Sequence, residues 1–125
     1  GDWSSDVCSS DLKEADIFDF NKTLKKKSGK PKKKILKKAK EDKDEVVVMS
    51  TQQGGHEEVR DWLDKHGLDK AKLVQRGTKE HDHDPQVKER MLGKLSRQFK
   101  VKKAYDDKKA NVKMFKRHGI KAKEV

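Results

Sequence analysis

The sequence lacks the features that mark secreted and membrane-embedded proteins. Its single Cys excludes a disulfide within the chain. Its apolar runs fall far short of the roughly 18–20 residues that span a membrane. The N-terminus is acidic and has no apolar segment of the kind found in signal peptides. These absences predict a cytoplasmic protein that is not embedded in a membrane.

Apolar residues are also scarce, at 30% of the chain, whereas charged residues make up 44%. Such a composition borders on disorder, but the apolar residues gather in blocks such as VVVM and MLGKL, which favours a folded domain. The net charge is +11, and a positive field of this size favours polyanionic partners such as nucleic acid. A gene rich in AAA and AAG codons would produce a similar excess of Lys, and the two explanations are compatible.

The first twelve residues differ in composition from the rest, because they contain no Lys or Arg. A common short-read sequencing adapter, translated in one frame, encodes DWSSDVCSSDL, which is the sequence of residues 2–12. We therefore interpret residues 1–12 as a non-native, adapter-derived segment, and we exclude them from the prediction of the fold. Without their three Asp, residues 13–125 carry a net charge of +14, and this interpretation predicts that the native N-terminus is missing. A native Ser- and Asp-rich terminus is the alternative, and genomic resequencing upstream of Lys13 would distinguish the two.

Short apolar blocks alternate with amphipathic segments from residue 13 onward. Apolar and β-branched blocks predict strands at residues 14–20, 45–50, 71–77, 101–107 and 120–125. Apolar residues at helical spacing predict helices at residues 31–42, 56–68, 85–99 and 108–119. Alternation of this kind is typical of a parallel sheet with helices on both faces. We therefore predict one α/β domain over residues 13–125.

Polar side chains follow several of the predicted strands, at the sheet edge where ligands of parallel sheets bind. Asp19 ends the first strand, and Asp106 and Asp107 end the fourth. Carboxylates from two strands suit a hard divalent cation such as Mg²⁺. An Asp at the end of a buried strand can also attack phosphorus as a nucleophile. The sequence therefore predicts a site for phosphate chemistry at this edge.

Four segments carry a resemblance to a known family. DIFDFNKTL, VVVMST, VKERML and AYDD resemble, in this order, the four motifs of the haloacid dehalogenase (HAD) superfamily. Together with WLDKHGL, LVQRG and AYDDKKANVKMFKRHGI, they are similar to the 3′-phosphatase domain of phage-type polynucleotide kinases. The resemblance implies a HAD-like three-layer α/β/α sandwich with a mostly parallel sheet. The chain is too short for an inserted cap domain, so the implied site is open and suits a polymer end or a phosphate on a protein.

The activity that the resemblance implies is a Mg²⁺-dependent phosphomonoesterase that acts on nucleic-acid or nucleotide phosphate through an aspartyl-phosphate. Asp19 would be the nucleophile and also a metal ligand. The backbone carbonyl of Asn21 would be a second ligand, and Asp106 and Asp107 would complete the metal site.

The resemblance also assigns residues to the phosphate and the substrate. Ser50 would contact the phosphate, and Lys88 would stabilise its charge. Thr23 would support the geometry of the loop after the first strand. Thr51 and Arg76 would lie close enough to contact the substrate.

Four positions depart from the family pattern. In the family, an Asp at the position of Asn21 acts as general acid and then as general base, and an amide can do neither. The reaction would therefore be ~10²–10⁴-fold slower. Thr51 and Gln52 replace the Gly and Arg that usually follow the motif II Ser in the polynucleotide branch, so a phosphate-binding Arg is absent. Lys22 replaces the usual Gly of motif I.

The identity of residue 21 distinguishes two hypotheses about the function of the domain. A single base change converts an Asp codon to an Asn codon, so either a base-call error or genuine loss of catalysis explains Asn21. The first hypothesis is a HAD-type phosphatase, impaired as written. The second is a catalytically inactive HAD-fold module that binds nucleic acid through its basic surface, with an affinity that falls steeply with salt.

Overall fold

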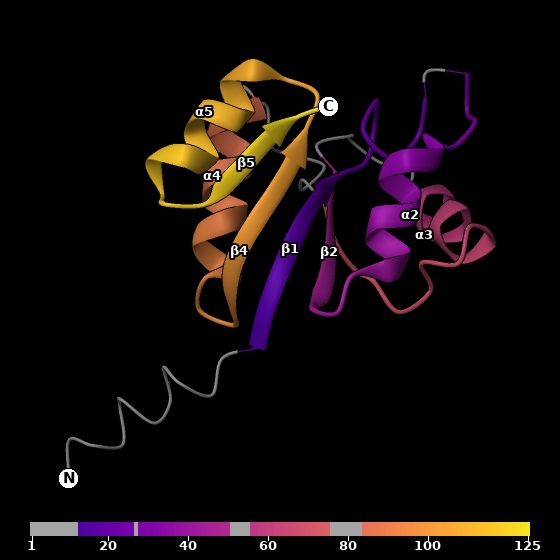
Figure 1. Cartoon of the computed structure of the whole chain (residues 1–125), viewed down its shortest axis with the longest axis horizontal. Coiled ribbons are helices and arrows are strands. Elements are labelled where there is room, and N and C mark those ends of the chain that lie inside the picture. The colour runs from indigo at the N-terminus through magenta and orange to yellow at the C-terminus, as the bar shows by residue number, and fades with distance from the viewer. Residues whose placement is uncertain (1–12, 27, 51–55, 76–83) are drawn as a thin grey trace, which may run out of the picture.

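Strands and helices alternate along the chain in the computed structural model (Figure 1). The structure describes residues 13–26, 28–50, 56–75 and 84–125. The elements are β1 (Lys13–Asp19), α2 (Lys33–Glu41), β2 (Glu45–Ser50), α3 (His56–Lys65), β3 (Lys72–Gln75), α4 (Asp84–Leu95), β4 (Phe99–Asp106), α5 (Lys109–Arg117) and β5 (Lys121–Glu124). Within these ranges, no helix is long and apolar enough to cross a membrane.

The strands form one five-stranded sheet in the order β3-β2-β1-β4-β5, and every neighbouring pair is parallel. β1 is the central strand, so its carboxyl end lies between those of β2 and β4. Asp19 is paired with Met49 of β2, and Phe18 is paired with Tyr105 of β4. The predicted parallel sheet is confirmed, and its register brings the ends of three strands to one edge.

Helices cover the sheet on both faces, with α4 and α5 on one side and α2 and α3 on the other (Figure 1). The side chains of β1 alternate between these layers, as the pleat of a strand requires. Ala15 and Ile17 pack in the core beneath α4 and α5, whereas Phe18 packs in the core beneath α2 and α3. The predicted HAD-like three-layer sandwich is therefore confirmed, and the described residues include no inserted cap domain.

Each predicted helix has at least one wrong boundary. The helix expected at residues 56–68 ends at Lys65, and the helix expected at residues 108–119 spans Lys109–Arg117. The helix expected at residues 85–99 ends at Leu95, because Phe99 instead pairs with Lys13 and begins β4. The helix expected from Pro31 begins at Lys33. Pro31 forms an isolated antiparallel bridge with Lys25, so the preceding loop is a short hairpin rather than the first turn of the helix.

Candidate active site

Asp19 lies buried at the end of the central strand, on the face of the sheet covered by α4 and α5. Both of its carboxylate oxygens accept hydrogen bonds. Thr23 Oγ1 donates to Asp19 Oδ2 at 3.2 Å, and Lys88 Nζ donates to Asp19 Oδ1 at 2.7 Å. The loop after β1 and the helix α4 therefore hold the carboxyl group in one orientation.

Lys88 is only 1% exposed, although Lys is among the residues least often buried. Its Nζ donates to Asp19 and also to Asp106 at the end of β4. Burial by itself would lower the pKa of Lys88, but the two carboxylates more than offset this and raise the pKa above its ordinary value. Lys88 thus remains a cation inside the protein and joins the carboxylates of two strands.

Asp106 is held in place by α5 as well as by Lys88. The backbone N–H of Lys108 donates to Asp106 Oδ1 at 2.9 Å. Asn111 Nδ2 lies 3.3 Å and 3.2 Å from the two carboxylate oxygens of Asp106. Asn111 is fully buried beside Val112, and the sequence reasoning did not select it. An amide on the apolar face of a helix is the signal that would have found it, because a buried polar group requires a partner.

Three carboxylates, those of Asp19, Asp106 and Asp107, offer oxygen atoms that all lie within 4.8 Å of one another. Oxygen atoms at this spacing, drawn from two strand ends, are the ligands that Mg²⁺ prefers. Burial, with a smaller contribution from Asp106, raises the pKa of Asp19 to about 7 against the lowering effect of Lys88. A divalent cation would favour the ionised form of all three groups, so the residues present fit a metal site.

The turn after β1 explains why the family has Gly at the position that Lys22 occupies in this chain. Lys22 has a φ of +66°, which places it in the left-handed region, and among the described residues no other non-glycine has a positive φ. The turn is closed by the N–H groups of Leu24 and Lys25, which donate to the carbonyl of Phe20 at 3.1 Å and 3.0 Å. This turn brings the Thr23 side chain back into hydrogen-bond distance of Asp19. Its left-handed backbone favours Gly at residue 22, where the family has one.

The remaining predicted site residues differ in their exposure to solvent, and two of them lie outside the described residues. Ser50 is buried at the end of β2, adjacent to β1 in the sheet. Asn21 is exposed and forms an isolated bridge with Lys25. Thr51 and Arg76, predicted to contact substrate, lie outside the described residues.

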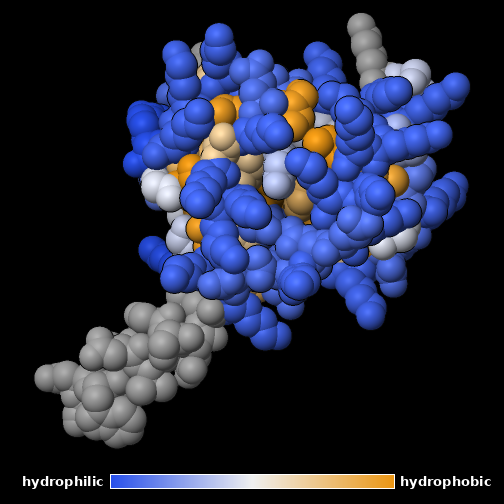
Figure 2. Space-filling view, viewed as in Figure 1, coloured by the Kyte–Doolittle hydropathy of each residue, from blue (hydrophilic) through white to orange (hydrophobic). Residues whose placement is uncertain are grey.

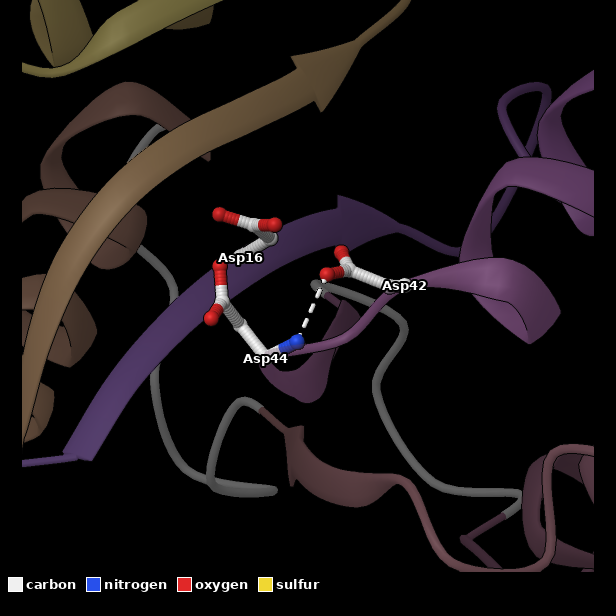
Figure 3. Close-up of side chains that lie close together, drawn as sticks. All are labelled: Asp16, Asp42 and Asp44. Carbon is white, nitrogen blue, oxygen red and sulfur yellow. Dashed lines mark hydrogen bonds between the residues drawn. The ribbon is translucent and has the colours of Figure 1, made fainter.

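A second acidic cluster, formed by Asp16, Asp42 and Asp44, lies on the opposite face of β1 from Asp19 (Figure 3). Figure 3 shows the three carboxyl groups turned toward one another, with the backbone N–H of Asp44 donating to Asp42 Oδ1 at 2.9 Å. Asp16 is 3% exposed, and its Oδ1 has no hydrogen-bond partner among the described residues. Burial raises the pKa of Asp16 to about 7, and Asp42 and Asp44 add to the rise, while Lys103 opposes it. This carboxyl group therefore takes up a proton near neutral pH.

A comparison with protein families identifies the domain. The family model described as the polynucleotide kinase PNKP phosphatase domain matches residues 8–125. The chain belongs to this polynucleotide kinase phosphatase domain family. The predicted membership of the HAD superfamily, in the branch of the polynucleotide kinase phosphatase domains, is thereby confirmed.

Two solved structures contain chains with the fold of this phosphatase domain. One is described as the structure of the Pnkp1/Rnl/Hen1 complex, with a TM-score of 0.79 and 23% identity over 93% of this chain and 47% of that chain. The other, described as the Pnkp1/Rnl/Hen1 RNA repair complex, has a TM-score of 0.78 and 23% identity over 91% of this chain and 42% of that chain. The chain thus spans less than half the length of these two neighbours. No curated protein matches it.

Proposed function

We propose that this domain is a Mg²⁺-dependent phosphomonoesterase that removes 3′-terminal phosphate from nucleic acid through an aspartyl-phosphate on Asp19. The buried cluster of Asp19, Lys88 and Asp106 carries the proposal, since it combines a nucleophile, a cation and a metal ligand at one sheet edge. Membership of the polynucleotide kinase phosphatase family supports the substrate class.

In the first step, a carboxylate oxygen of Asp19 forms a bond to phosphorus while the bond from phosphorus to the 3′ oxygen breaks. The nucleic acid leaves as an alkoxide that takes up a proton. Thr23 and Lys88 hold the attacking carboxylate still, which lowers the entropic cost of alignment. Lys88 also supplies positive charge beside the transferred group, where negative charge accumulates.

In the second step, water attacks the phosphorus of the aspartyl-phosphate and releases inorganic phosphate, which regenerates the carboxylate of Asp19. Ser50, buried at the end of the neighbouring strand, is the proposed hydrogen-bond donor to the phosphate. Asp19, Asp106, Asp107 and the backbone carbonyl of Asn21 would hold Mg²⁺. When bound, the ion would neutralise charge on the phosphoryl oxygens.

Asn21 limits both steps. Its amide can neither protonate the departing 3′ oxygen nor accept a proton from the attacking water. We therefore expect a rate ~10²–10⁴-fold below that of a chain with Asp at this position. Asn21 together with the charge of +14 on residues 13–125 is also what favours the alternative, a catalytically inactive module that binds nucleic acid.

Phosphate release from a 3′-phosphorylated oligonucleotide with Mg²⁺ tests the proposal. The Asn21→Asp variant should gain activity by ~10²–10⁴-fold over the unmodified chain. The matched control is Asn21→Asp combined with Asp19→Asn, which restores the acid but removes the nucleophile and should be inactive. An Asn21→Asp variant without activity, or a control as active as that variant, would refute the enzymatic role of Asp19.

A further inference from the structure

A groove lined largely by lysine lies beside the candidate active site. It has a volume of about 810 Å³ and is formed by the hairpin after β1, the first turns of α2 and the residues at the end of β5. Seven of its ten lining residues are Lys, and the other three, Pro31, Ile35 and Val125, are apolar. Figure 2 shows apolar surface ringed by hydrophilic side chains between α2 and the carboxyl ends of β4 and β5. We call this feature the lysine groove.

Backbone hydrogen bonds link the lysine groove to the residues that hold Asp19 and the metal ligands. The N–H of Val125 donates to the backbone carbonyl of Asp106 at 2.9 Å. The loop that follows Asp19 leads into the hairpin between Lys25 and Pro31, which carries Lys26 and Lys30. The N–H of Lys32 anchors this hairpin by donating to the carbonyl of Leu24 at 2.8 Å. The groove therefore lies at the same edge of the sheet as the proposed reaction centre.

The lysines of the groove are not paired with acidic groups in the part of the chain that the structure describes. Among the described residues, no lysine of the groove forms an ion pair, whereas Lys37 on another face of α2 pairs with Glu41 at 4.0 Å. Clustered like charges repel one another. The first turn of α2 also contains no acidic residue, although helix N-termini favour negative charge. The stability of the fold therefore does not explain the lysines, and a polyanion would relieve their repulsion.

The apolar residues of the groove, Pro31, Ile35 and Val125, indicate which kind of polyanion it binds. Ile35 is buried and Val125 is partly exposed, so some apolar surface lies between the lysines. Lys38, at the rim, lies over the ring of Tyr105, 5.5 Å from its centroid. Single-stranded nucleic acid presents phosphates along its backbone and base faces that contact apolar or aromatic side chains. A free phosphate would use the lysines but would leave the apolar surface without a partner.

We infer that the lysine groove binds the single strand of nucleic acid whose 3′-terminal phosphate reaches Asp19. The inference rests on the proposed function, because it describes how the substrate of that reaction is held. The strand follows the hairpin and the start of α2, its phosphates lie against Lys30, Lys34 and Lys123, and its bases or sugars lie against Pro31 and Ile35. Affinity comes from phosphate contacts, so binding is tolerant of sequence and sensitive to salt.

The test compares two charge-reversal variants of the whole chain. The groove variant carries Lys30→Glu and Lys34→Glu. The matched control carries Lys94→Glu and Lys113→Glu, which makes the same change in net charge at exposed positions of α4 and α5, on the other face of the sheet. Circular dichroism establishes that both variants are folded.

The first measurement is the fluorescence anisotropy of a fluorescein-labelled oligothymidylate without a 3′-phosphate, titrated at several salt concentrations. The groove variant should bind at least about tenfold more weakly than the unmodified chain, and its plot of log affinity against log salt should be shallower by about 1.4, or ~0.7 for each lost contact. The control should retain most of its affinity and its slope. Equal losses in the two variants would overturn the inference.

The second measurement uses the Asn21→Asp background and two substrates, a 3′-phosphorylated oligonucleotide and p-nitrophenyl phosphate. The ratio of kcat/KM for the first to kcat/KM for the second should fall about tenfold or more in the groove variant, and it should be unchanged in the control. An unchanged ratio in the groove variant would overturn the inference and leave the proposed function intact. If neither substrate is hydrolysed, the proposed function fails, and the anisotropy measurement still decides whether the groove binds nucleic acid.

Discussion

Lys88 and Asp19 are separated by 69 positions in the chain, yet Lys88 Nζ lies 2.7 Å from Asp19 Oδ1 in the interior of the protein. The lysine comes from α4 and the carboxylate from the end of the central strand. The same nitrogen contacts Asp106, so one cation compensates two buried anions. Loss of this cation is more costly than loss of a surface charge, because removing one partner of a buried ion pair leaves the other unpaired.

The Lys88→Met variant keeps most of the side-chain volume and removes the charge. Its free energy of unfolding should fall by about 3–5 kcal/mol, because two carboxylates then remain buried without a cation. Urea denaturation measures this value, and added Mg²⁺ should restore part of it. Lys94→Met, at an exposed position of the same helix, is the control and should change stability little. Equal stability of the two variants would contradict a central role for Lys88 in this cluster.

The Lys22→Gly variant should be more stable than the unmodified chain. A left-handed backbone conformation costs a residue with a Cβ about 1–2 kcal/mol, and Gly avoids this cost. Part of the benefit is lost because Gly has more conformational freedom in the unfolded chain. We expect a net gain of about 0.5–1 kcal/mol in the free energy of unfolding. Lys43→Gly is the control, since Lys43 is exposed and does not have a positive φ. It should lower stability, and a similar loss for Lys22→Gly would disprove strain at that residue.

Asp16 should make the protein less stable as the pH rises. Its pKa of about 7 in the folded protein lies above the ordinary value of 3.8, so the folded state binds the proton more tightly than the unfolded chain. The resulting stability is fully present below pH 3.8 and is lost as the pH rises through about 7. The Asp16→Asn variant cannot ionise there, so above pH 7 it should be more stable by about 1–3 kcal/mol.

Denaturation of the unmodified chain and of Asp16→Asn across this range of pH measures the effect. The difference in their free energies of unfolding should grow with pH. Asp69→Asn, at an exposed position whose side chain is far less buried, is the control and should show no such trend. A pH-independent difference for Asp16→Asn would mean that Asp16 keeps an ordinary pKa.

Asn111 should act on the metal site through Asp106, as a positioning residue. In the Asn21→Asp background, Asn111→Ala removes the amide that donates to the Asp106 carboxylate, so the Mg²⁺ concentration for half-maximal activity should rise by ~10–100-fold. Lys113→Ala, an exposed change in the same helix, should leave that concentration unchanged. A purely structural role would lower kcat or stability without altering the Mg²⁺ dependence, and that result would contradict the prediction.

Local patterns in the sequence were sufficient for most of the fold. Apolar and β-branched blocks located every described strand, and the 3.6-residue spacing of apolar residues located every described helix. The errors at Pro31 and Phe99 occurred where the pairing of distant segments decided the boundary. Phe99 is apolar enough to extend α4, but its pairing with Lys13 places it in β4.

The sequence by itself determined that Asp19, Asp106 and Asp107 end strands and that the chain carries the ordered HAD-type motifs. Only the tertiary structure decided which groups face these carboxylates. The strand order places β4 beside β1, and this brings Lys88, Asp106 and Asn111 to one site. The same order creates the Asp16 cluster and adds Lys123 to the lysine groove, whose other six lysines lie between residues 26 and 38. Charge and burial depend on distances in space, and periodicity along the chain does not encode them.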